Sequence, residues 1–220
     1  MGATRQELSG GFYSLVELTR LISYRTDPTS VPTVLRWVKD GLVASGHQEG
    51  HATYSFYDLV SLLVVSRLRA AGVKLAAIRT AEEHLRKTEH ISRPFATRML
   101  YTDGVDVLYR ANPAIEHQRT AANRVGPEVL EKTLPETLRG VRYMDDVAAW
   151  WDIEPTVRLH PDIQFGEPCI PETRLPTAQL FALNNAGESP QKLSRLYEKP
   201  LEDVQAAIRF ERRLLEAAKT

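Results

Sequence analysis

The segment from residue 33 to residue 54 carries hydrogen-bond donors whose types and spacing suit the binding of nucleic acid. Arg36 and Lys39 are three residues apart, so they lie on one face if this segment is a helix. A helix fits the major groove of DNA, where an arginine can donate two hydrogen bonds to guanine or hold a phosphate. His51, Thr53 and Tyr54 follow and can donate to backbone phosphates. This pattern predicts a DNA-binding surface.

The predicted surface contains seven residues. They are Thr33, Arg36, Trp37, Lys39, His51, Thr53 and Tyr54. Arg36 and Trp37 also have an interpretation that does not involve DNA. An arginine beside a tryptophan can be a surface cation packed on the aromatic ring.

Local signals predict the helices that position these donors. Ser14 and Glu17 have the spacing of a capping box, which begins a first helix, and the stretch 25–32 with Asp27-Pro28 is a turn. Pro32 fits the first turn of a second helix, and Gly41 ends that helix.

The segment 42–54 has two glycines and few apolar residues, and it predicts a short hairpin. Ser55 can cap a third helix that Gly72 closes, and a fourth helix is expected over 75–87. The resulting order is helix, turn, helix, hairpin and two further helices.

The character of the sequence changes after residue 93. Segments 95–102 and 105–110 are rich in β-forming residues and are joined by Asp103-Gly104, which favours a tight hairpin. Segments 141–144 and 148–153 predict two more strands. The apolar residues of segments 95–102 and 105–110 are candidates for a dimer surface: Phe95, Met99, Val105, Val107 and Tyr109.

The C-terminal part predicts a compact unit. A strand is expected over 157–159, and the stretch 160–176 holds four prolines, so it is a rigid irregular arm. Three helices follow, over 177–185, 189–197 and 201–218. Leu193, Leu196 and Tyr197 are expected on one side of the second of these helices. In the third, Val204, Ala207, Ile208 and Leu215 are expected to share a side.

Composition narrows the function classes. The 28 basic and 28 acidic residues give no net charge, which argues against electrostatic binding of nucleic acid by the whole molecule. Residues 1–110 carry 14 Lys and Arg against 11 Asp and Glu, and residues 111–220 carry 14 against 17. This asymmetry places a DNA-facing surface in the first half.

Several chemistries are not expected. Cys169 is the only cysteine, so a disulfide within the chain and a cysteine-based zinc site are excluded, and a buried, inert thiol is expected. No apolar run approaches the roughly 20 residues of a membrane helix, and the N-terminus lacks a signal-peptide pattern, so a cytoplasmic protein is expected. Catalytic motifs, metal sites and cofactor loops are not found, which predicts a protein that is not an enzyme.

Residues 12–87 resemble the winged helix-turn-helix of the MerR and excisionase superfamily. The matching features are Tyr13-Ser14-Leu15, Leu35-Arg36-Trp37 with Gly41-Leu42, Tyr54 with Asp58-Leu59, and Arg69-Ala70-Ala71-Gly72-Val73. The resemblance implies that Arg36, Lys39 and the hairpin contact DNA.

Residues 157–214 resemble a small domain of unknown function that is typical of VapB-type antitoxins, the partners of PIN-like ribonucleases. The features shared with that domain are Pro161, Gly166-Glu167-Pro168-Cys169-Ile170, Thr173-Arg174, Ala186-Gly187-Glu188-Ser189 and Glu202-Asp203-Val204. A PIN-like nuclease holds its metal with clustered carboxylates, so the resemblance implies that Arg174, Arg209 or Arg213 contacts the toxin.

These observations predict a mainly α fold with small β elements. The expected parts are a winged helix-turn-helix (12–90), a β-rich connector that also suits dimerisation (94–155) and a trihelical C-terminal domain (156–220). We expect an antitoxin that, as a homodimer, binds double-stranded operator DNA and neutralises a PIN-like ribonuclease, without a cofactor or metal.

The sequence is also compatible with two alternatives. One is a MerR-like regulator that senses a small molecule through residues 94–155, which an apolar cavity between the two β-rich patches would favour. The other is a protein-interaction scaffold that does not bind DNA, which an acidic or occluded recognition helix would favour.

Overall fold

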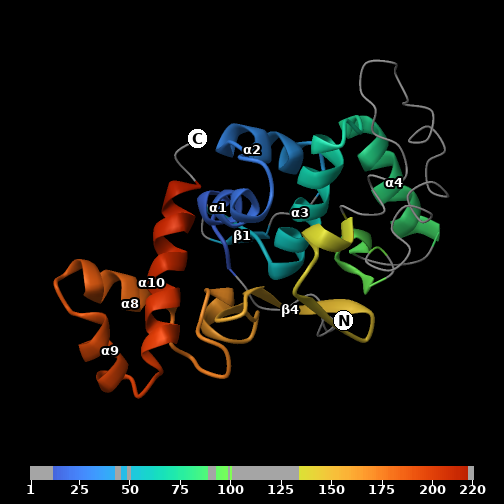
Figure 1. The fold of residues 1–220 in the computed structure, drawn as a ribbon. Coiled ribbons are helices and arrows are strands. Elements are labelled where there is room, and N and C mark those ends of the chain that lie inside the picture. The colour runs from blue at the N-terminus through green and yellow to red at the C-terminus, as the bar shows by residue number, and fades with distance from the viewer. Residues whose placement is uncertain are drawn as a thin grey trace.

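The computed structural model describes residues 12–42, 46–48, 51–88, 93–98, 100 and 134–217. These residues form a mainly helical fold with a three-stranded antiparallel sheet, as the sequence predicts (Figure 1). The first half contains α1 (Leu15–Arg25), α2 (Val31–Lys39), β1 (Gly46–Gln48), β2 (His51–Thr53), α3 (Phe56–Ala70), α4 (Leu75–Thr88) and the 3-10 turn η1 (Pro94–Ala96). The second half contains β3 (Val141–Met144), β4 (Val147–Glu154), β5 (Val157–Leu159), the 3-10 turn η2 (Gln164–Gly166), α8 (Thr177–Asn185), α9 (Pro190–Leu196) and α10 (Leu201–Glu216).

Local signals define the ends of the N-terminal helices. The Ser14 hydroxyl accepts from the Glu17 N–H, and the Glu17 carboxylate accepts from the Ser14 N–H, which confirms the capping box at α1. Ser55 begins α3 in the same way through Asp58. Gly41 follows α2 with a φ of 80°, a left-handed conformation that glycine adopts without strain.

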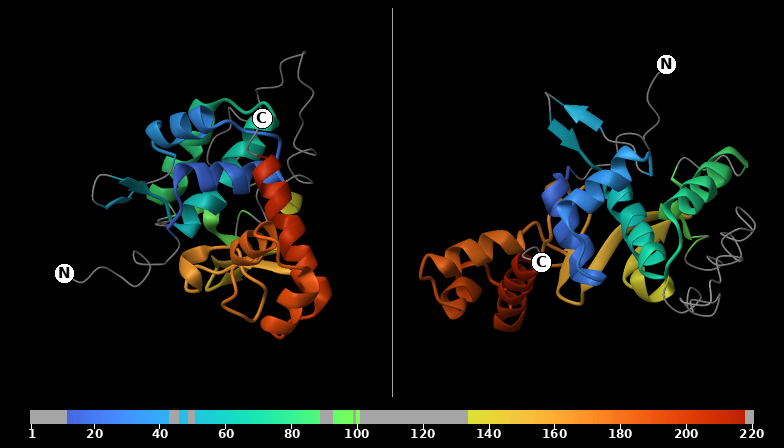
Figure 2. Two further views of the ribbon diagram at one scale, coloured as in Figure 1. Left: turned by 90° about the vertical axis from the view of Figure 1, so that its left-hand side faces the viewer. Right: turned by 90° about the horizontal axis from the view of Figure 1, so that it is seen from above.

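The expected hairpin is present between α2 and α3. β1 and β2 pair antiparallel with Gly46 opposite Thr53, and Figure 2 shows this hairpin projecting away from the helices. Its exit is fixed by a bridge in which the backbone groups of Tyr13 and Tyr54 exchange two hydrogen bonds of 2.9 and 3.0 Å. The bridge attaches the hairpin to the start of α1.

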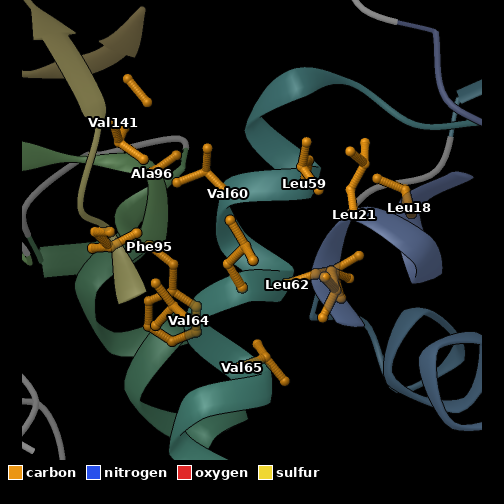
Figure 3. Packing of buried hydrophobic residues seen from close by; sticks show 14 of the residues in the cluster. Leu18, Leu21, Leu59, Val60, Leu62, Val64, Val65, Phe95, Ala96 and Val141 are labelled. Carbon is orange, nitrogen blue, oxygen red and sulfur yellow. The ribbon is translucent and has the colours of Figure 1, made fainter. Parts of the chain in front are cut away.

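Helix α3 is the centre of the larger hydrophobic core. Its side chains are apolar around most of its circumference, which is the pattern of a helix covered on every side. Figure 3 shows Leu59 and Leu62 facing Leu18 and Leu21 of α1, with Val60 and Val64 on the opposite side, near η1 and β3. The first helix and the sheet therefore pack against opposite sides of one helix.

Strands β3, β4 and β5 pair in that order and confirm the strands that the sequence predicts in this region. Along β4, Trp151 is fully buried and Trp150 is half-buried, as alternation in a half-covered strand requires. Trp151 belongs to the same buried cluster as the helices of the first half. This sheet thus completes the N-terminal core.

The strand predicted over 95–102 is wrong where the structure describes it. Residues 94–96 form η1, and the Phe95 side chain is 1% exposed between α3 and the sheet. Phe95 is therefore a core residue and not part of a dimer surface, because its burial in the N-terminal core outweighs its local β propensity. Met99 and segment 105–110, with the Asp103-Gly104 turn, lie outside the described residues.

The three predicted C-terminal helices are α8, α9 and α10. Ser189 caps α9 by accepting from the Lys192 N–H, and Pro190 occupies the first helical position. A second buried cluster lies among these helices: Ile170, Leu180, Leu193, Val204, Ala207 and Ile208. Leu196 and Leu215, which the pattern placed inward, are exposed, and Leu214 is buried in place of Leu215.

Helix α10 belongs to both clusters. Val204, Ala207 and Ile208 near its start pack in the C-terminal cluster, whereas Phe210 and Leu214 pack in the core that α1 and α3 share with the sheet. Figure 1 shows α10 lying beside α1. The helix-turn-helix and the C-terminal unit are consequently joined through buried side chains.

Candidate nucleic-acid interface

Helix α2 has one buried and one exposed side. Val34 and Trp37 face the core, and Arg36 and Lys39 are exposed. The spacing of three residues therefore places the two cations outward, as the helical periodicity predicts. This side of α2 presents two positive charges to solvent.

The remaining predicted DNA contacts occupy different environments. Thr33 is half-buried, and its hydroxyl lies 2.9 Å from the Ser30 hydroxyl before the helix. Thr53, at the end of β2, is also half-buried. The backbone of His51 pairs in the hairpin, but its side chain lies outside the described part of the chain.

Trp37 and Tyr54 are core residues. Trp37 is 4% exposed and Tyr54 is 3% exposed, and both belong to the large hydrophobic cluster. Burial also raises the pKa of the Tyr54 hydroxyl. The structure thus places these two predicted contact residues in the core, away from the exposed side of α2 that carries Arg36 and Lys39. The reason is that the apolar side of α2 and the hairpin exit must both cover the core.

The interpretation of Arg36 as a cation resting on Trp37 is not what the described residues show. Within them, arginine–ring contacts join Arg158 to Trp150 at 5.4 Å and Arg213 to Tyr24 at 4.8 Å. Trp37 is 4% exposed and belongs to the large hydrophobic cluster. Arg36 is left on the surface.

Three arginines were predicted to contact a partner protein, and all three are exposed. Arg174 lies on the proline-rich arm, where its carbonyl accepts from the Gln164 amide at 2.9 Å, and Arg209 lies on α10. Arg213 instead binds within the chain, because it donates to Glu154 of β4 at 2.8 Å and covers the ring of Tyr24. Arg213 therefore joins α10 to β4 and α1.

Polar contacts reinforce the junction between α1 and the C-terminal unit. The Tyr24 hydroxyl also donates to Glu154, and its ring lies 5.0 Å from that of Phe210. At the other end of α1, the buried Tyr13 hydroxyl donates to the Gly166 carbonyl at 2.8 Å. Burial raises the pKa of both tyrosines well above their ordinary value. Neither hydroxyl ionises near neutral pH, so both contacts persist there.

The arm is fastened to the sheet through its backbone. Arg158 of β5 and Cys169 exchange hydrogen bonds of 2.8 and 2.9 Å, and the Cys169 thiol is buried, as expected. Burial raises the pKa of this thiol to about 11. The Arg158 side chain donates to Asp152 and Glu172 at 2.6 Å each, which ties β4, β5 and the arm together.

Among the described residues, no three histidine, cysteine, aspartate or glutamate side chains are grouped so that they could hold a metal ion. None of the helices in the described ranges combines the length and the apolar character needed to cross a bilayer.

The helix-turn-helix with its hairpin, α1 to α3, has the architecture of a winged DNA-binding domain. Residues 28–85 match the family described as MerR HTH family regulatory protein. Residues 157–210 match the family described as protein of unknown function, DUF433. The chain thus has a MerR-like helix-turn-helix, the domain of DNA-binding regulators, and a C-terminal DUF433 domain.

Among solved structures, the crystal structure of Rv2018 from Mycobacterium tuberculosis is similar, with a TM-score of 0.69 and 21% sequence identity. The likeness covers 89% of this chain and 96% of that chain, so the two share a fold over nearly their whole length. No curated protein matches the sequence.

Proposed function

We propose that this protein is a cytoplasmic, non-enzymatic antitoxin that represses its own operator and neutralises a PIN-like ribonuclease. The observation that carries the DNA-binding half is the exposure of Arg36 and Lys39 on α2, the helix that follows the turn and precedes the hairpin. The match of residues 28–85 to MerR regulators supports the same assignment.

The exposure of α2 also bears on the alternatives. A scaffold that does not bind DNA would be favoured by an acidic or covered recognition helix, whereas α2 carries two exposed cations and its acidic cap residue, Asp40, is half-buried. A DNA-reading role is therefore the better proposal. A single recognition helix makes few base contacts, so we infer that a homodimer binds two half-sites about one helical turn apart.

The antitoxin half rests on the C-terminal unit. The features of the 157–214 segment resemble domains found in VapB-type antitoxins, and the exposed side chains of Arg174 and Arg209 lie on it. In a nuclease site built from carboxylates, an inserted guanidinium would compete with the metal or the RNA for the same oxygens. Arg213 is a weaker candidate for this role because Glu154 already holds it.

Operator binding tests the proposed DNA-binding role. We expect Arg36→Ala in the full-length protein to weaken binding to its own promoter region by about 1–3 kcal/mol if Arg36 reads a base, with the loss concentrated at one position of the operator. If Arg36 holds a phosphate, the loss is uniform across sequences and the salt dependence falls by about one counterion. A fluorescence-anisotropy titration at several salt concentrations distinguishes the two cases.

Arg195→Ala is the matched control, because Arg195 is exposed on α9, which Figure 1 shows at the outer end of the C-terminal unit, away from α2. It should leave the affinity within about 0.5 kcal/mol of the wild type, as surface substitutions usually do. Equal affinities of the wild type, Arg36→Ala and Arg195→Ala would show that α2 does not contact the operator.

Inhibition of the nuclease tests the proposed antitoxin role, and this assay requires the full-length protein. Phe210 and Leu214 pack in the N-terminal core and β5 pairs with β4, so a fragment from residue 155 onward would lose part of its support. With the proposed PIN-like ribonuclease partner, Arg174→Ala and Arg209→Ala should weaken inhibition of RNA cleavage, and Arg195→Ala should not. Full inhibition by the Arg174→Ala/Arg209→Ala double variant would locate the neutralising surface elsewhere.

A further inference from the structure

A pocket of about 220 Å³ lies between α1 and the C-terminal unit. Its walls come from three segments that are far apart in the sequence: α1 with the residues before it, the arm around η2, and the helices α8 and α10. The volume is below the roughly 300–1,000 Å³ of pockets that hold drug-sized molecules, so it suits a smaller compound. None of its lining residues comes from the β-rich connector that the sequence suggested for ligand sensing.

The charged side chains in the lining are unbalanced. Glu17, Glu167 and Glu211 contribute carboxylates, and Arg20 contributes a guanidinium. Glu17 already accepts from the Ser14 N–H at the start of α1, and Glu167 is exposed on the arm. The pocket therefore has an excess of negative charge.

Glu211 is the buried one of these three carboxylates. It is 7% exposed, Thr177 donates a hydrogen bond to it, and it forms no ion pair within the described residues. The charge of Arg20 lowers the pKa of Glu211, but no ion pair joins the two side chains within the described residues and this effect does not outweigh burial. Burial raises the pKa of Glu211, which reflects the cost of a carboxylate held away from water. A cation in the pocket would remove that cost.

Two exposed aromatic rings belong to the same lining. Phe12 is 51% exposed and Phe165 is 67% exposed, and their ring centroids lie 5.9 Å apart at an interplanar angle of 50°. The Phe12 N–H donates to the Phe165 carbonyl at 2.9 Å, which holds the pair together. Phe165 has a φ of 54°, a conformation that is unfavourable for a bulky residue and leaves its ring in solvent. Aromatic faces attract organic cations.

We propose that this junction pocket binds a small organic monocation, an ammonium or guanidinium group on an apolar stem, with the charge on Glu211 and the stem against Phe12 and Phe165. The bound cation would contact both α1 and α10, so it would fasten the helix-turn-helix to the C-terminal unit. A free amine and a lysine or arginine side chain share this chemistry, and the probes below separate them.

Calorimetric titration of the full-length protein tests the proposal without DNA or a protein partner, so its result is independent of the proposed function. Three probes of similar size are compared at matched ionic strength: benzylamine (a cation), benzyl alcohol (neutral) and benzoate (an anion). We expect saturable binding of benzylamine, with binding of benzyl alcohol weaker by roughly tenfold, which is the loss when a hydrogen bond to a charged group is removed. Benzoate should not bind.

Variants identify the site. Glu211→Gln keeps an oxygen that can accept from Thr177 and should weaken benzylamine binding roughly tenfold. Glu167 is exposed on the arm, so its replacement does not disturb the core. Glu167→Gln should weaken benzylamine binding by a smaller factor than Glu211→Gln does. Glu216→Gln is the control, because Glu216 is exposed on the same helix as Glu211 but does not line the pocket, and it should bind as the wild type does.

N-acetylarginine amide distinguishes the two sources of the cation. Tighter binding of this probe than of benzylamine assigns the pocket to a basic side chain, and the reverse order assigns it to a free amine. Absence of saturable binding of both cations, tighter binding of benzoate than of benzylamine, or equal affinity of wild type and Glu211→Gln would each overturn the proposal.

Discussion

Truncation of Phe210 tests whether the helix-turn-helix and the C-terminal unit unfold together. Phe210 lies on α10, within the segment that matches DUF433, yet its ring is fully buried in the N-terminal core, 5.0 Å from the ring of Tyr24. A buried phenylalanine replaced by alanine usually costs about 3–5 kcal/mol, because transfer free energy is lost and a cavity remains. Domains of this size have about 5–15 kcal/mol in total, so the change is large.

Hydrogen exchange of the backbone amides locates the loss. In Phe210→Ala, the amides of α3 should exchange faster by roughly a factor of 10³, since each 1.4 kcal/mol corresponds to tenfold. Leu193→Ala removes a fully buried side chain from the C-terminal cluster instead. It should lower protection in α8 and α9 by about 2–5 kcal/mol and leave α3 within about 1 kcal/mol of the wild type. Arg212→Ala, exposed on α10, is the control and should change neither.

The opposite pattern would refute the reasoning. If Phe210→Ala accelerated exchange only in α8 to α10 and left α3 protected, the ring would not support the N-terminal core. The two parts would then unfold independently, and the shared buried cluster would contribute little to the stability of α3.

Three further predictions concern buried polar groups. Asp58 accepts from Ser55 and Arg93 while only 2% of its side chain is exposed, so Asp58→Ala should destabilise the protein to urea by about 2–4 kcal/mol; a loss below 0.5 kcal/mol would contradict this role. Burial raises the pKa of Glu211, so its ionisation destabilises the fold as pH rises above about 4.3, the ordinary value. Glu211→Gln should therefore have a higher Tm than the wild type at pH 8, with the difference vanishing below about pH 4, and a pH-independent difference would disprove this cause. The Cys169 thiol, with a pKa of about 11, should react with maleimide at pH 8 at least ~100-fold more slowly in the folded than in the urea-unfolded protein, and equal rates would show that it is accessible.

Much of the fold could be predicted because its signals are local. The capping box at Ser14, the serine caps at Ser55 and Ser189, and the glycine after α2 act within four residues of themselves. Hydrophobic periodicity likewise placed Arg36 and Lys39 on the outer side of α2. These features need no distant partner, so the sequence alone is sufficient to predict them.

Burial could not be predicted so well, because it depends on which segments meet. Phe95 has a local β preference but lies in a 3-10 turn against α3, and Leu196 follows a helical pattern but is 64% exposed on a helix of seven residues. Trp37 and Tyr54 have donors suited to DNA, yet the core requires their rings. In each case tertiary packing outweighed the local signal.

The junction between the two parts was determined only by the tertiary structure. The sequence pattern divides the chain near residue 155, and nothing near Phe210 or Glu154 indicates that they meet Tyr24 of α1. The pocket at this junction likewise combines residues from α1, the arm and α10. A pattern within one segment specifies which side of that segment is apolar, but the neighbour that covers the side is selected by the packing of the whole chain.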